Sequence, residues 1–78
     1  MVILGSNCHI SQNVTIGAGK NGYPSLGDNV TVYGNTTICG KIRIGNNVII
    51  GANSFVNKDI PDNVTVGGCP ARILKYNN

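Results

Sequence analysis

The residues that could carry out chemistry in this chain are few and widely spaced. Among 78 residues there are one histidine, His9, and three cysteines, Cys8, Cys39 and Cys69. Histidine is the side chain most often used as a general base near neutral pH. His9 is therefore the only candidate for a catalytic side chain, although its outward place in the repeat described below also suits an ordinary surface histidine.

The cysteines indicate neither a disulfide framework nor a metal site. They are odd in number and far apart, and the chain has no Cys-x-x-Cys or His-x-x-x-His pair. Cys8 falls at an inward position of the repeat and Cys39 replaces a common glycine, so we expect packing roles. Unpaired cysteines suit a reducing compartment. The sequence thus predicts a cytoplasmic protein with no metal.

A six-residue repeat must position these side chains. Its second position is usually Gly, its fourth is usually Asn, and its first is aliphatic in Leu4, Ile10, Ile16, Leu26, Val32, Ile38, Ile44, Ile50 and Val56. Apolar residues do not follow helical spacing, and Gly, Asn, Thr and Val are weak helix formers. Because Gly and Asn tolerate the positive φ angles of tight corners, the repeat predicts an all-β solenoid of short strands and turns.

Nine edges predict about three triangular coils, stacked about 4.8 Å apart as parallel strands. The first and fifth positions would fill the interior, and the fifth is often small or apolar: Cys8, Val14, Val30, Thr36, Ile42, Val48, Ser54 and Ile60. The repeat pattern leaves the hand of the coil open. We expect a repeat domain over residues 1–61, with a loop insertion at 19–25, and an irregular C-terminal capping tail over 62–78.

The N-terminal end of the repeat shows no cap. Residues 1–3 lead directly into the first edge, which would leave a strand edge and the apolar stack exposed. The sequence favours a fragment of a longer protein over an assembly that covers this end.

Composition excludes two classes of partner. The net charge is +3, only 12% of residues are charged, and there are four aromatic residues. A nucleic-acid interface would show a basic stripe with aromatic residues, which is missing here. No apolar run approaches the roughly 20 residues that span a membrane. We therefore expect neither nucleic acid nor a membrane as a partner.

The repeats also resemble a known family. The loop GKNGYP, the hexads LGDNVTVYGNTTICGKIRIGNNVIIGANSF and the closing KDIPDNVTVGGCPARIL are similar to the C-terminal part of hexapeptide-repeat acyltransferases. Serine acetyltransferases and related sugar O-acetyltransferases are the nearest in pattern. The resemblance implies a left-handed parallel β-helix, a homotrimer, acetyl-coenzyme A bound between neighbouring subunits, and a small-molecule acceptor.

The resemblance implies roles for particular residues. Gly19 and Lys20 lie in a loop that borders the active cleft, with Tyr23 and Pro24 on its acceptor side. Small residues that let the pantetheine arm lie along the coil are Gly34, Thr36, Ala52 and Ser54. Lys58 and Arg72 lie in segments that approach the phosphates of the cofactor. Cationic side chains are suited to that task, and arginine favours two-pronged contacts.

Two departures leave two functions open. Relatives remove the acceptor proton with a histidine that lies about two edges before the segment matching Leu4. A second histidine stands where this chain has Tyr23. One function is an acetyl-CoA-dependent O-acetyltransferase, truncated at its N-terminus. The alternative is a catalytically inactive trimeric β-helix module, a remnant without the general base.

Overall fold

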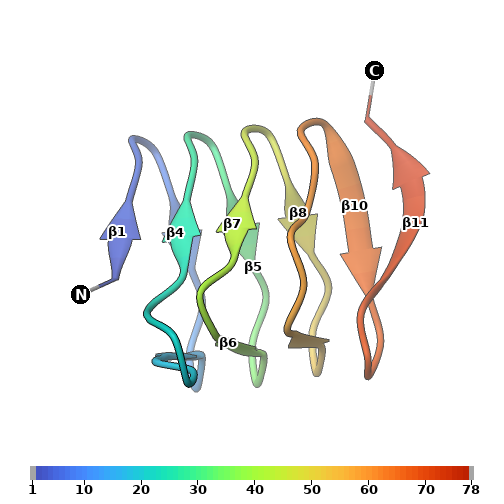
Figure 1. Ribbon diagram of the computed structural model, residues 1–78. Helices are drawn as coiled ribbons and strands as arrows, with labels where there is room; N and C mark the ends of the chain where they lie inside the picture. Colours follow the sequence, from blue (N-terminus) through green and yellow to red (C-terminus); the bar gives the residue numbers. More distant parts are fainter. Residues whose placement is uncertain (1, 78) are drawn as a thin grey trace.

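The computed structural model describes residues 2–77, which form a triangular prism of short strands (Figure 1). The strands are β1 (Ile3–Leu4), β2 (His9–Ile10), β3 (Thr15–Gly17), β4 (Ser25–Leu26), β5 (Thr31–Val32), β6 (Thr37–Cys39), β7 (Arg43–Ile44), β8 (Ile49–Ile50), β9 (Phe55–Val56), β10 (Val64–Gly67) and β11 (Arg72–Tyr76). These residues contain no helix, so the all-β prediction is confirmed.

Three sheets form the faces of the prism. Face A contains β1, β4 and β7; face B contains β2, β5, β8, β10 and β11; face C contains β3, β6 and β9. Successive coils pair in parallel, and Ser25 pairs with Arg43, 18 residues further along the chain. Eighteen residues are three edges of six, as the repeat predicts. The corners are named AB, BC and CA after the faces they join.

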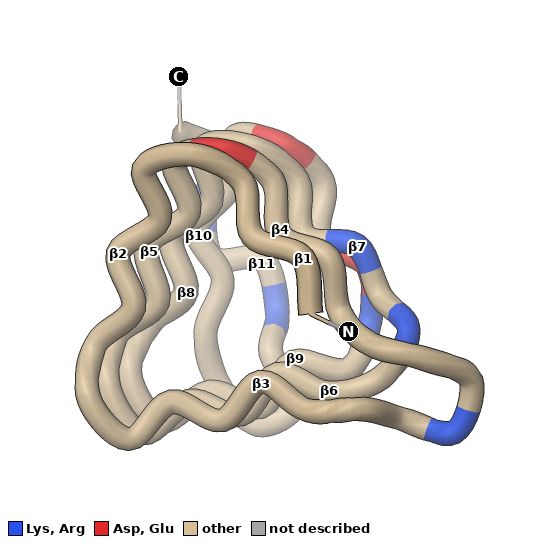
Figure 2. The backbone as a smooth tube through the Cα atoms, turned by 90° about the vertical axis from the view of Figure 1, so that its left-hand side faces the viewer, with Lys and Arg blue, Asp and Glu red and all other residues tan. Residues whose placement is uncertain are grey.

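The coil is left-handed. Figure 2 looks along the prism from its N-terminal end. The chain passes from β1 over the AB corner to β2 and then through β3, running counter-clockwise as it recedes from the viewer. The repeat pattern did not decide this hand. The family resemblance implied it, and the structure confirms it.

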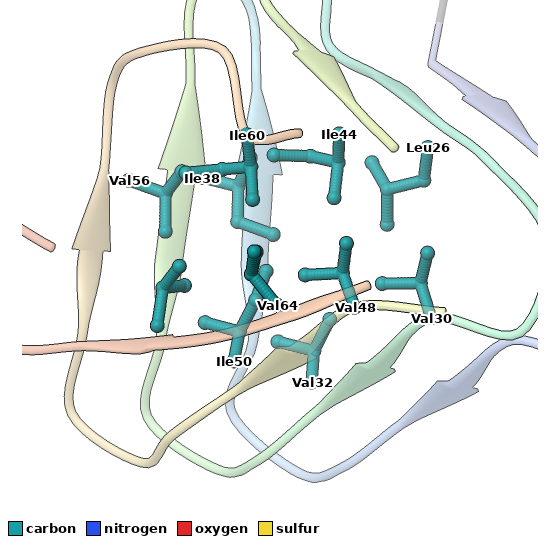
Figure 3. Close-up of a cluster of buried hydrophobic side chains, with 11 residues drawn as sticks. Leu26, Val30, Val32, Ile38, Ile44, Val48, Ile50, Val56, Ile60 and Val64 are labelled. Carbon is teal, nitrogen blue, oxygen red and sulfur yellow. The ribbon is translucent and has the colours of Figure 1, made fainter. Parts of the chain in front are cut away.

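The core is a stack of branched aliphatic side chains inside the prism (Figure 3). The first-position residues are buried from the second coil onward, together with fifth-position residues such as Val30 and Val48. Each fully buried Ile or Val contributes roughly 1.5–3 kcal/mol. In the first coil, Leu4 is 49% exposed and Ile10 is 38% exposed, because only one neighbouring coil covers them.

Asparagines turn the AB and BC corners. Seven of them adopt φ angles of 57–61°: Asn7, Asn13, Asn29, Asn35, Asn47, Asn53 and Asn63. This left-handed conformation disfavours most L-residues, and asparagine tolerates it because its short side chain bonds locally. At these two corners, the asparagine at the fourth position of the repeat is therefore what lets the chain change direction.

A ladder of hydrogen bonds joins the coils at the AB corner. The backbone N–H of Ser6 donates to Asp28 Oδ1 (2.8 Å), that of Asp28 donates to Asn46 Oδ1 (2.8 Å), and that of Asn46 donates to Asp62 Oδ1 (2.7 Å). The preceding glycines allow this close approach. A Cβ added at Gly45 would lie 2.7 Å from the backbone nitrogen of Asp62.

The repeat extends further than the expected three coils and irregular tail. Ile60 bridges to Ile44, and β10 pairs in parallel with β8, which adds an incomplete fourth turn. The chain then returns as β11, antiparallel to β10, and closes face B. Counting hexads placed Ile60 at a fifth position. It occupies a first position instead, because the preceding edge, from Val56, is two residues shorter than a regular hexad.

Candidate functional site

The loop over residues 18–24 leaves the prism at the CA corner and projects from it (Figure 2). The N–H of Gly19 donates to the carbonyl of Gly22 (2.7 Å), which narrows the base of the loop and leaves Lys20 exposed near the tip. Gly19 lies against the backbone of Gly40, and the side chain of Lys41 lies against Gly22. The base of the loop is therefore fixed to the next coil.

Tyr23 and Pro24 end the loop. Pro24 is buried, and its carbonyl accepts a hydrogen bond from the N–H of Ile3 (3.3 Å). Tyr23 is 49% exposed, so its ring is available beside the prism. The structure thus separates the two acceptor-loop residues: Pro24 anchors the loop, whereas Tyr23 faces a groove.

This groove lies on face A and has a volume of about 370 Å³. It is lined by Ile3, Tyr23, Ser25, Lys41, Ile42, Arg43 and Asp59. The N–H of Arg43 donates to Asp59 Oδ1 (2.9 Å), which holds that carboxylate at one end of the groove. Sequence analysis missed Lys41, Arg43 and Asp59. The available signal was the register, since Ser25, beside the loop, pairs with Arg43 one coil further on.

Gly34 and Ala52 lie on the BC corner, one coil apart. The N–H of Asn53 donates to the carbonyl of Gly34 (3.0 Å), which ties the two coils together at that point. Gly34 has no side chain and Ala52 is exposed. The corner therefore presents backbone with little side-chain cover over two successive coils.

The other two small residues lie inside the prism. Thr36 is fully buried and Ser54 is 2% exposed. Thr36 Oγ1 donates to the carbonyl of Gly51 (3.1 Å), and Ser54 Oγ donates to the same carbonyl (2.6 Å). These two residues, expected among the small ones that let the pantetheine arm lie along the coil, fill fifth positions of the interior, and their hydroxyl groups form hydrogen bonds there.

The two cationic residues expected near the phosphates lie apart from each other. Lys58 is exposed at the CA corner, after β9, whereas Arg72 is exposed at the start of β11. Lys20 and Lys41 also belong to the CA corner or its loop, and Arg43 follows this corner as the first residue of β7. Figure 2 shows most of the basic residues on this side of the prism.

His9 lies on face B, exposed and paired with Thr31 of the next coil. Face B is opposite the CA corner, so His9 is far from the loop of its own chain (Figure 2). The three cysteines are free, and Cys69 is exposed on the BC corner of the fourth turn.

Apart from His9 on face B, the structure thus divides the expected site residues among four places. The loop and Lys58 share the CA corner, Gly34 and Ala52 share the BC corner, Thr36 and Ser54 are internal, and Arg72 is on β11. Within residues 2–77, no three histidine, cysteine or acidic side chains are grouped so that they could hold a metal ion. Those residues also contain no helix long and apolar enough to cross a membrane.

Comparisons with known proteins agree with this architecture. Residues 23–58 match the family model described as bacterial transferase hexapeptide (six repeats). The serine acetyltransferase of Buchnera aphidicola is 42% identical over 79 residues, which cover 95% of this chain and 30% of that protein. The chain therefore spans less than a third of the length of this relative.

Solved structures show the same likeness. The serine acetyltransferase of Neisseria gonorrhoeae matches with a TM-score of 0.93 at 40% identity, over 99% of this chain and 31% of that one. The serine acetyltransferase of Brucella abortus in complex with coenzyme A matches with a TM-score of 0.87 at 28% identity, over 99% and 38%. Together with nine hexads in register and the left-handed prism, these matches confirm the resemblance: residues 23–58 match the hexapeptide repeat of bacterial transferases, and the chain is similar to the C-terminal β-helix of serine acetyltransferases.

Proposed function

We propose that this chain forms part of an acetyl-CoA-dependent O-acetyltransferase. In the reaction, a hydroxyl oxygen of a small acceptor bonds to the acetyl carbon, the thioester C–S bond breaks, and coenzyme A leaves as the thiol after proton transfer. The observation that carries the proposal is the near-complete match, over 99% of the chain, to a serine acetyltransferase that holds coenzyme A.

The BC corner is the proposed path of the pantetheine arm. A thin amide-containing chain needs close access to backbone N–H and C=O groups, and Gly34 and Ala52 leave that access open. Neighbouring coils are about 4.8 Å apart, so the BC corner offers backbone contacts to the arm at regular intervals. Thr36 and Ser54 contribute indirectly, because their internal hydrogen bonds hold the corner at Gly51.

The CA corner and its loop supply the proposed phosphate contacts. Gly19 shapes the loop, Lys20 is exposed on it, and Lys58 is exposed beside it. Arg72 is a further candidate, although it lies on another element. Exposed cations of this kind attract anions in a way that salt weakens.

A homotrimer would bring these corners together. The loop and the BC corner lie at opposite ends of face C, about 20 Å apart for six extended residues. One chain therefore does not close a cleft around its own BC corner. In a ring with threefold symmetry, the loop of one subunit can reach the BC corner of the next.

Most of the surface required for this assembly carries no acidic or basic side chains. Segments 9–17, 31–39 and 49–57 form most of faces B and C and contain no Lys, Arg, Asp or Glu. Tyr33 is 50% exposed there, and Ile49 and Phe55 are partly exposed. Protein interfaces are depleted in charge and enriched in aromatic residues at their centres. The tan left and lower sides of Figure 2 show this surface.

A catalytically inactive trimeric module is the second candidate function. It is favoured by the position of His9, which lies on face B and does not meet the loop of the same chain. His9 serves as a base only if face B of one subunit approaches the loop of another. The free cysteines support a reducing compartment, and we place either form of the protein in the cytoplasm.

Calorimetry with coenzyme A, followed by a thiol-release assay with acetyl-CoA and hydroxyl acceptors, tests these functions. The transferase predicts both binding and acceptor-dependent thiol release, with a loss of about 10²-fold or more in rate for His9→Gln if His9 is the base. Binding without release supports the inactive module. A folded chain that does neither contradicts the proposal.

A further inference from the structure

The groove on face A is not used by the proposed cofactor path. Its floor is a column of three outward-pointing residues in register, Ile3, Ser25 and Arg43. Two coil steps separate the ends of the column, about 10 Å in total. The floor therefore changes from apolar through a small hydroxyl to a charged group over that length.

The apolar end is suited to a ring. Tyr23 and Ile3 both line the groove, and both are exposed, at 49% and 61%. Ile42, which lies between Lys41 and Arg43 in the chain, also lines the groove. Ligand pockets commonly combine such apolar and aromatic surface with a few polar groups that fix orientation. Tyr23 and Ile3 provide a surface for the C–H face of a saturated ring.

The other end is suited to an anion. Lys41 and Arg43 contribute two positive charges and Asp59 one negative charge, so this end has a net charge of +1. Arginine forms two-pronged hydrogen bonds with carboxylates and phosphates. Asp59 already accepts the N–H of Arg43, but a carboxylate has several acceptor positions and can also accept hydroxyl donors.

We propose that this groove binds the acyl acceptor, and that the acceptor is a sugar bearing one anionic group, a carboxylate or a phosphate. This inference rests on the proposed function. A single amino acid spans about 3.5 Å along its backbone, roughly a third of the column. Serine would therefore leave either the apolar end or the charged end without a partner, whereas a sugar ring with an anionic substituent contacts both.

Calorimetric titrations of the unmodified chain with glucuronate, glucose 6-phosphate, glucose and L-serine test this inference. We expect at least one of the two anionic sugars to bind about tenfold more tightly than glucose and L-serine, and added salt to reduce the difference. The two anionic sugars distinguish a carboxylate from a phosphate. Coenzyme A is titrated into the same preparation as a separate test of the proposed function.

Two variants locate the binding. Arg43→Gln and Lys41→Gln should each weaken binding of the anionic sugar by about fivefold or more, while Lys75→Gln, an exposed lysine on β11, should leave it unchanged. Circular dichroism confirms that each variant is folded. Equal binding of glucose, tighter binding of L-serine, or equal losses in all three variants would overturn the inference.

Binding of coenzyme A without binding of any sugar contradicts this inference and leaves the proposed function standing. Binding of the anionic sugar without coenzyme A supports the groove as a binding site and counts against the transferase. The two failures are therefore distinguishable in one set of titrations.

Discussion

The AB and CA corners are built from the same repeat but differ in regularity. At the AB corner, successive first-position residues are always six apart, from Leu4 to Ile10 through Ile60 to Val66. At the CA corner, the spacing is ten residues in the first coil, from Ile16 to Leu26. It is six from Ile38 to Ile44, and four from Val56 to Ile60.

The difference in regularity follows from the hydrogen bonds that join neighbouring coils at each corner. The AB corner is a continuous ladder in which one backbone N–H of each coil has a side-chain oxygen of the next coil as its partner. An insertion there would break two bonds of the ladder. Beside the CA corner, the described residues show one bond of this kind, from the N–H of Arg43 to Asp59 Oδ1, and the extra residues of this corner form a loop beside a groove. Departure from the repeat therefore marks the region where the prism can carry function without losing its core.

Exchange of one glycine at each corner should give the largest difference in stability. Gly45→Ala places a Cβ against the backbone of Asp62 and should destabilise the fold by about 3 kcal/mol. Gly17→Ala, before the loop, has no atom within 4 Å of the new Cβ and should be neutral or stabilising by about 0.5 kcal/mol. Urea unfolding measures both, and equal effects would contradict the close approach of coils at the AB corner.

Blocking the BC corner should affect binding and leave the fold intact. Ala52→Glu puts a bulky side chain on the proposed path of the pantetheine arm and should weaken coenzyme A binding more than about tenfold, or 1.4 kcal/mol. Ser6→Glu, an exposed position of the AB corner, is the matched control and should bind normally. Calorimetry provides the comparison. If both variants bind alike, the cofactor does not follow the BC corner.

Removing one rung of the ladder should have a moderate effect. Asn46→Ala deprives the N–H of Asp28 of its acceptor and should cost about 1 kcal/mol. Asn57→Ala, at an exposed position of the CA corner, should change stability by less than about 0.5 kcal/mol. Thermal unfolding of both variants is the measurement, and an equal shift in Tm would show that the ladder adds nothing specific.

Deleting residues 20–23 should produce the smallest change in stability. The deletion restores six-residue spacing between Ile16 and Leu26 and keeps Pro24, whose carbonyl pairs with Ile3. The free energy of unfolding should change by less than about 1 kcal/mol, since loop length contributes weakly. Coenzyme A and acceptor binding should fall, because Lys20 and Tyr23 are lost. Unfolding and calorimetry on the same sample separate the two effects, and a collapsed fold would show that the loop is structural.

Much of the fold could be predicted because each hexad repeats the same local requirement. An aliphatic residue at every first position and an asparagine at nearly every fourth position indicate inward packing and a turn, and Ile38, Ile44 and Ile50 are all fully buried. The fourth turn could not be counted, because Val56 and Ile60 are only four residues apart and pairing with Ile44 is a contact between coils.

The site was less predictable from the sequence. The resemblance selected Gly34 and Ala52, which lie outside on the BC corner, and Thr36 and Ser54, which lie inside. The fifth-position rule had already indicated burial for the latter pair, since the hexad position fixes the direction of a side chain. The groove residues Lys41, Arg43 and Asp59 come from two coils and meet Tyr23 only across a corner of irregular length.

The sequence by itself determined the period, the inward stripe, the turning residues and the family resemblance. The tertiary structure alone decided which coils face each other across the CA corner, and therefore where the groove lies and which charges line it. The physical reason is that hexad chemistry is local to six residues, whereas register between coils depends on the summed length of three edges. An insertion or a shortened edge changes that sum without changing any single hexad.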